Sequence, residues 1–103
     1  EKLIKDALIL EKLGCFALVL EKIPSKLAKK VAKSLKIPVI GIGAGSDVDG
    51  QVLVLHDMIG MTNEFSPRFL RRYMNLFESM TESIGNYVKD VKSSDFPNKD
   101  EQY

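Results

Sequence analysis

A single acidic residue ends the most apolar stretch of the chain. In FALVLEKIP, residues 16–24, four large or branched apolar side chains and one alanine precede Glu21. A carboxylate held at the end of an apolar strand can act as a general base. Acidic residues in such places also cap helices and anchor loops. The residues alone therefore leave two interpretations of Glu21 open, a general base or a loop anchor.

Three glycines, Gly41, Gly43 and Gly45, interrupt the next apolar stretch, IPVIGIGAG. The dinucleotide-binding pattern G-x-G-x-x-G does not fit, because its third glycine falls at Ser46 and the segment leads to another strand instead of opening a helix. Glycines at the end of a strand let the backbone approach a ligand closely. We expect either the wall of a binding site, with Gly43 and Gly45 beside the substrate, or tight packing of the backbone.

His56 and Asp57 follow a third apolar stretch, QVLVLHDMIG. Adjacent residues of a strand point to opposite faces, so the two side chains cannot easily reach one metal ion. The chain has one histidine, which makes a His-based metal site a weak hypothesis. The favoured interpretation of His56 is a hydrogen-bonded structural histidine, and a position beside the substrate is the alternative.

Hydrophobic periodicity predicts the elements that position these residues. Strands that alternate with helices predict parallel strands and an α/β fold. Helices are expected over residues 2–13, 25–36 and about 68–92, strands over 15–20, 37–43 and 51–57, and a polar, extended or mobile tail over about 93–103. This set is too small to cover both faces of so apolar a sheet, so further cover is expected from elsewhere in a larger α/β structure.

Length and composition predict one small soluble domain, since 45% of the 103 residues are hydrophobic and 28% are charged. The net charge of +1 gives no overall basic field, so no nucleic-acid partner is expected. No apolar run is long enough to span a membrane, and the N-terminal residues lack the pattern of a signal peptide. We therefore expect no membrane partner and a cytoplasmic location, and the single Cys15 excludes an internal disulfide.

The motifs taken together resemble one family, the ketopantoate hydroxymethyltransferases. DALILEKLG, LVLEKIP, IPVIGIGAG and DGQVLVLHD appear in the order and at the spacing that this family shows, and the polar ending is also similar to the family's. The resemblance covers essentially the whole chain. It implies that residues 1–103 are the C-terminal part, about three strands and their helices, of a single (β/α)₈ TIM-barrel domain.

The resemblance also implies a reaction. The family transfers a hydroxymethyl group from 5,10-methylenetetrahydrofolate to α-ketoisovalerate, which gives ketopantoate for pantothenate and coenzyme A synthesis. It implies that Glu21 removes the proton from C3 of the keto acid and that Mg²⁺ stabilises the enolate. The metal ligands are expected in an absent N-terminal part, with no metal site in this chain, so the chain alone is expected to be inactive. The expected partners are the keto acid, the folate, the remainder of the barrel and further subunits of a homo-oligomer.

Two other functions stay open at this point. A phosphate-handling TIM barrel would bind a phosphoryl group at the glycine loop, because such sites recur after the last strands of barrels. A non-catalytic α/β interaction module would dock on a partner through the helix expected at about 68–92. The apolar stripe of that helix indicates a subunit contact or core packing; it contains Phe69, Tyr73, Met80, Ile84 and Tyr87.

Overall fold

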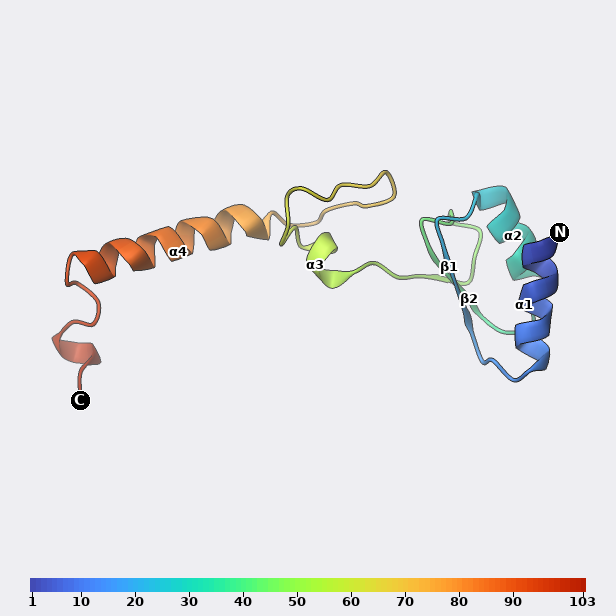
Figure 1. The fold of residues 1–103 in the computed structure, drawn as a ribbon, viewed down its shortest axis with the longest axis horizontal. Helices are drawn as coiled ribbons and strands as arrows, with labels where there is room; N and C mark the ends of the chain where they lie inside the picture. The colour runs from blue at the N-terminus through green and yellow to red at the C-terminus, as the bar shows by residue number, and fades with distance from the viewer. The chain divides into compact units, whose positions relative to one another are not determined.

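The computed structural model describes residues Glu1–Tyr103 and divides the chain into two compact units. The first unit is Glu1–Val54 with Pro67–Leu70, and the second is Leu55–Ser66 with Arg71–Tyr103. The length of the chain had predicted a single domain. The elements are α1 (Lys2–Lys12), β1 (Leu18–Glu21), α2 (Ser25–Ser34), β2 (Val39–Ile42), β3 (Gly50–Gln51), α3 (Leu55–Met58), α4 (Leu76–Lys92) and the 3₁₀ helix η1 (Lys99–Glu101) (Figure 1).

A parallel sheet with the order β1-β2-β3 forms the centre of the first unit. Leu18 lies opposite Val39, and Ile40 lies opposite Gly50. The connection from β1 to β2 runs through α2, as a parallel pair of strands requires. The parallel strands confirm the α/β class that the alternation of elements predicted.

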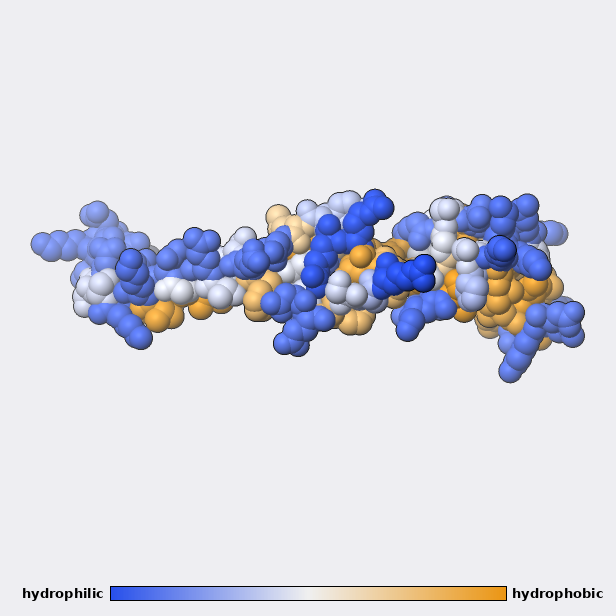
Figure 2. All heavy atoms as spheres, turned by 90° about the horizontal axis from the view of Figure 1, so that it is seen from above, coloured by the Kyte–Doolittle hydropathy of each residue, from blue (hydrophilic) through white to orange (hydrophobic).

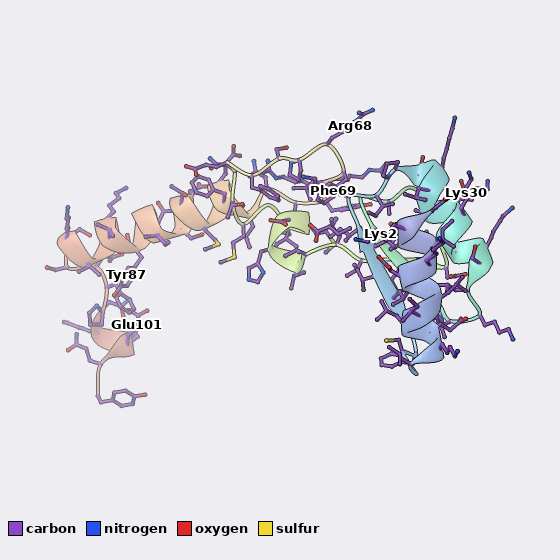
Figure 3. The ribbon with its side chains drawn as sticks, turned by 45° about the vertical axis from the view of Figure 1, so that its right-hand side comes forward. Lys2, Lys30, Arg68, Phe69, Tyr87 and Glu101 are labelled. Atoms are coloured by element: carbon purple, nitrogen blue, oxygen red, sulfur yellow. The ribbon has the colours of Figure 1, made fainter.

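The helices α1 and α2 lie on the same side of this sheet (Figure 1), and the core fills the space between them and the strands. The buried core residues are Ala7 of α1, Ala28 and Val31 of α2, Leu20 of β1, Val39 of β2 and Ala44. The lysines of α2 lie off this core, and Lys30 is exposed (Figure 3). Val19 is nevertheless 63% exposed. Figure 2 shows further hydrophobic side chains on the surface.

Glu11 connects the end of α1 to the segment just before β2. One oxygen of its carboxylate accepts hydrogen bonds from the backbone N–H groups of Lys36, at 2.5 Å, and Ile37, at 3.0 Å. A carboxylate is a strong acceptor for backbone donors that have no partner of their own in a strand or helix. Glu11, a residue of the DALILEKLG motif, therefore has a structural task.

The third strand is shorter than its apolar sequence predicts. The N–H of Val52 donates to the Gly41 carbonyl at 3.0 Å, but β3 itself is limited to Gly50–Gln51. The neighbouring strand β2 ends at Ile42, and the chain turns away at Gly43, so later residues have no strand beside them. The prediction that residues 51–57 form one strand is therefore wrong, and His56 and Asp57 lie on the short helix α3.

The long helix of the second unit begins later than about residue 68. Its first residue is Leu76, and its last is Lys92. The N–H of Tyr73 donates to the Met58 carbonyl at 2.8 Å, and the N–H of Leu76 donates to the Ile59 carbonyl at 3.0 Å. These donors are thus paired with the chain around α3, and the predicted start of the helix is wrong.

The polar tail is more ordered than an extended end. Asn98 and Glu101 form a capping box around η1, with side-chain hydrogen bonds of 2.9 and 3.0 Å. The Phe96 ring packs edge-on against Tyr87 of α4 at 5.5 Å between ring centroids. Tyr87 and Glu101 mark α4 and η1 in Figure 3. Neither α4 nor any other helix is both long and apolar enough to cross a membrane.

Candidate active site

Glu21 is the last residue of β1 and belongs to the face of the sheet that α1 and α2 leave open. Leu20 is buried in the core, whereas Val19 and Glu21 are exposed. Side chains alternate between the two faces of a strand, so Glu21 shares its face with Val19 and not with Leu20. The structure therefore places the candidate base at the carboxyl end of a parallel strand, away from the packed helices.

Apolar side chains of β2 extend this open face beside Glu21. Glu21 lies opposite Ile42, and Val19 lies opposite Ile40. Both isoleucines are only half buried, while Val39 and Gly41, which alternate with them, are buried. The carboxylate is thus the polar end of a surface made of branched apolar side chains. The open face therefore combines one carboxylate with fully or partly exposed apolar side chains.

The backbone after Glu21 is held in an unusual conformation. Lys22 has a φ of +51°, and its N–H donates to the Ile42 carbonyl at 2.9 Å. A side chain other than glycine seldom adopts this region, and such residues cluster at functional sites, where surrounding contacts hold them in place. Pro24 follows directly before α2. The pairing with β2 therefore continues one residue beyond the carboxylate and fixes the loop that carries it.

Protein atoms fill the space beside Gly43. Gly43 has a φ of +66°, and a Cβ placed on it would lie 2.9 Å from the ring of Phe69. Phe69 was expected on the stripe of the long helix, but it belongs to the first unit (Figure 3). Of the two interpretations of Gly43, tight packing is supported by this contact, and a position beside the substrate stays a prediction.

Gly45 and Gln51 form a second contact of the glycine loop. The side-chain amide of Gln51 donates to the Gly45 carbonyl at 2.8 Å. Gly45 has a φ of +83° and lies against Ser25, the first residue of α2. Gln51 was not singled out from the sequence, although it is the third residue of the DGQ motif. Its role could be found only once the loop and the strand were seen side by side.

His56 lies in the second unit, on the exposed side of α3. Its backbone carbonyl accepts a hydrogen bond from the N–H of Met61 at 2.8 Å. No hydrogen bond of its ring is present, so the interpretation as a hydrogen-bonded structural histidine finds no support. A place for His56 beside the substrate stays a prediction.

The acidic side chains of the glycine loop are involved in structural contacts. No group of three His, Cys, Asp or Glu side chains lies close enough together to share a metal ion. Asp47 pairs with Lys29 at 3.0 Å, and Asp49 accepts a hydrogen bond from the N–H of Val39 at 2.8 Å. These two acids of the glycine loop thus hold the loop in place.

Comparison with known proteins gives the same family along nearly the whole chain. A profile of the family described as ketopantoate hydroxymethyltransferase matches residues 1–99. Curated relatives named 3-methyl-2-oxobutanoate hydroxymethyltransferase are 75% identical in Flavobacterium johnsoniae, 68% in Porphyromonas gingivalis and 67% in Bacteroides fragilis. Each match covers all 103 residues of this chain and 38% of the relative's length. The chain therefore belongs to the ketopantoate hydroxymethyltransferase family.

Proposed function

We propose that this chain works as one part of a longer enzyme that transfers a hydroxymethyl group to α-ketoisovalerate, and that Glu21 is its general base. The carrying observation is the position of Glu21 at the carboxyl end of a parallel strand, on the face that α1 and α2 do not cover. In TIM barrels, catalytic groups come from the carboxyl ends of the strands. The relatives' name gives the same keto acid, 3-methyl-2-oxobutanoate, as their substrate.

The proposed first step is a proton transfer from carbon to the Glu21 carboxylate. The electrons of the C3–H bond become those of the enolate, and C3 then forms a carbon–carbon bond to the one-carbon unit of 5,10-methylenetetrahydrofolate. The carbon–nitrogen bonds of that unit break, tetrahydrofolate leaves, and water supplies the hydroxyl group of the product. C3 of α-ketoisovalerate carries two methyl groups, which match the apolar surface of Val19, Ile40 and Ile42. The enolate also needs stabilisation of its oxygen, and the groups that supply it lie outside this chain.

The rest of the barrel is proposed to cover the open face of the sheet. Val19 is 63% exposed although it lies in the middle of an apolar strand. The chain spans 38% of the length of its relatives, so strands from the remaining length can supply this cover. A cytoplasmic location, a requirement for magnesium and the placement at the C-terminal end of the barrel rest on the resemblance alone.

The helix α4 is proposed as a subunit contact of a homo-oligomer. None of its residues is buried within the chain. An open, mainly apolar groove runs along it, lined by Leu76, Ser79, Met80, Ser83 and Ile84. Figure 2 shows hydrophobic side chains on this part of the molecule. An amphipathic helix with no buried face needs a further surface to pack against.

The proposal is tested with Glu21→Gln in the full-length enzyme. The variant keeps the size of the side chain but cannot accept the proton. Deuterium exchange at C3 of α-ketoisovalerate, followed by NMR in D₂O without folate, isolates the first step. General-base catalysis contributes about 10²–10⁴-fold, so a loss of that size is expected. Asp6→Asn, which changes an exposed acid on α1 in the same way, is the matched control and should exchange at the wild-type rate.

Two results contradict the proposal in different ways, one from this experiment and one from substrate assays of the wild-type enzyme. Wild-type exchange in the Glu21→Gln enzyme removes Glu21 from the role of base. If the wild-type enzyme converts a phosphate ester, but neither exchanges the C3 proton nor uses the folate, the proposed reaction itself is wrong. No structural observation favours this phosphate alternative, since Phe69 packs on Gly43 and Ser25 packs on Gly45.

A further inference from the structure

We infer that Gln51 is a positioning residue for Glu21, which it reaches through the glycine loop and the first residue of α2. This inference rests on the proposed role of Glu21 as the base. Three contacts hold the residues of this route in place, and all of them lie within the first unit. Gln51 holds Gly45, Gly45 lies against Ser25, and Ser25 closes the short loop that Glu21 begins.

The first contact is the hydrogen bond from the Gln51 amide to the Gly45 carbonyl, at 2.8 Å. Gln51 lies opposite Gly41 in the pairing of β2 with β3. A Cβ on Gly41 would lie 3.4 Å from the Gln51 Nε2 atom and 3.0 Å from the Val48 Cγ2 atom. The Gln51 side chain therefore crosses the sheet above a residue that has no side chain. Its length and its donor group both match the distance to the loop.

The second contact joins the glycine loop to α2. A Cβ placed on Gly45 would overlap with the Cβ of Ser25 and would lie 3.1 Å from its Cα. The two backbones are thus in direct contact, with no room for a side chain between them. Ala44, next to Gly45, is buried in the core at 1% exposure. The loop is consequently held at Ala44 by the core and at Gly45 by the hydrogen bond of Gln51.

The third contact holds the other end of the loop that carries Glu21. The N–H of Lys22 donates to the Ile42 carbonyl at 2.9 Å, directly after the carboxylate. Ser25 ends the same loop at the start of α2, and the ring of Pro24 stiffens the chain between them. A shift of Gly45 therefore moves one of the two fixed ends of a four-residue segment. A general base is sensitive to such a shift, because proton transfer requires a close and oriented contact.

The test is Gln51→Met in the full-length enzyme, because methionine keeps the length of the side chain and removes the donor. The measured quantities are kcat and KM for C3 deuterium exchange of α-ketoisovalerate, together with the melting temperature. A misplacement of the base well below 1 Å is expected to lower kcat for exchange about tenfold. KM should change by less than about twofold, because the substrate's other contacts are unaffected. The melting temperature should stay close to the wild-type value, since Gln51 is exposed.

Lys29→Met is the matched control for this variant. The ion pair of Lys29 with Asp47, at 3.0 Å, also joins the glycine loop to α2, but its two side chains are 45% and 52% exposed. This pair joins two flexible side chains and binds neither backbone, unlike the hydrogen bond of Gln51 to the Gly45 carbonyl, so exchange should stay within about twofold of the wild type. The control separates the specific route through Gly45 and Ser25 from any loss of a contact between this loop and this helix.

A second pair of variants tests the same route without Gln51. Gly45→Ala places a Cβ against Ser25 and should lower kcat for exchange in the same way. Ser25→Gly, added to Gly45→Ala, removes the overlapping Cβ atom and should restore part of that loss. This pair remains informative even if Gln51→Met does not fold, provided that the melting temperature is measured beside kcat. A loss and recovery of kcat at an unchanged melting temperature supports the positioning role, whereas changes in the melting temperature alone overturn it.

The outcomes separate this inference from the proposed function. Exchange at the wild-type rate in Gln51→Met, while Glu21→Gln is inactive, overturns the positioning role and leaves the base in place. A lower melting temperature with unchanged kcat shows that Gln51 only stabilises the fold, which also overturns it. Wild-type exchange in Glu21→Gln removes the base, and the inference falls with it. Loss of kcat in Gln51→Met and recovery of exchange in the Ser25→Gly double variant support it.

Discussion

Glu21 and Ile42 are direct partners in the parallel pairing of β1 with β2, and each is the last residue of its strand. Partner residues in such a pair point to the same face of the sheet. The carboxylate thus has a branched apolar side chain next to it on the neighbouring strand. The chemistry and the apolar recognition of the substrate are proposed to meet at this pair.

Ile42→Ala should lower kcat/KM for α-ketoisovalerate. The substitution removes apolar surface where the methyl groups of the substrate are proposed to lie, and each lost methylene contact in a substrate pocket changes specificity by about tenfold or more. Steady-state kinetics with α-ketoisovalerate measures the effect. Ile9→Ala, at an isoleucine that is 56% exposed on α1, is the control and should leave kcat/KM unchanged. An unaltered kcat/KM in Ile42→Ala would place the substrate elsewhere.

Gly43→Ala should destabilise the enzyme. The added Cβ would lie 2.9 Å from the Phe69 ring, and alanine is strained at a φ of +66°. The free energy of unfolding should fall by about 1–3 kcal/mol, as measured by urea denaturation. Phe69→Ala in the same background should not recover all of this, because the backbone strain stays. Gly85→Ala is the matched control, since no atom lies within 4 Å of a Cβ there. This helix substitution should be neutral or stabilise by about 0.5–1 kcal/mol.

Glu11→Ala should lower stability without changing the chemistry. Two backbone N–H groups, those of Lys36 and Ile37, lose their acceptor. Hydrogen bonds to a charged group contribute about 1.5–3 kcal/mol each when well formed, and these partly exposed ones should together contribute about 2 kcal/mol. Urea denaturation measures the loss, and kcat for C3 exchange should stay at the wild-type value. Asp6→Ala on the same helix has no such partner and should change stability by less than about 0.5 kcal/mol. If the two variants are equally stable, the hydrogen bonds of Glu11 do not stabilise the fold.

Ile84→Lys should weaken the assembly of the full-length enzyme. Ile84 is 59% exposed and lines the groove of α4, which is the proposed subunit contact. A charge placed in an apolar contact without a partner is costly to bury, so the complex should dissociate to smaller species. Light scattering coupled to size-exclusion chromatography measures the mass. Asn86→Lys adds the same charge on the other side of the helix and should leave the mass unchanged. An intact oligomer in Ile84→Lys would place the contact elsewhere.

The sequence by itself determined the elements whose pattern depends on local periodicity. The helices α1 and α2, the strands β1 and β2 and their parallel arrangement follow from apolar spacing, from Gly14 and from Pro24. The sequence also singled out Glu21, because a carboxylate directly after an apolar strand can act as a general base. The ordered motifs indicated the family without any knowledge of the fold.

Only the tertiary structure decided which residues find a neighbouring strand, a hydrogen-bond partner or a packing contact. The apolar run after Gln51 has strand propensity, but it leaves the strand state because β2 ends beside it at Ile42. The start of the long helix shifted to Leu76 for a related reason, since donors before it bond to residues around α3. The contacts of Gly43 with Phe69 and of Gly45 with Ser25 join residues 20 or more positions apart in the chain. Periodicity reports which face of an element is apolar, whereas such pairings depend on the neighbour that the folded chain brings to that face.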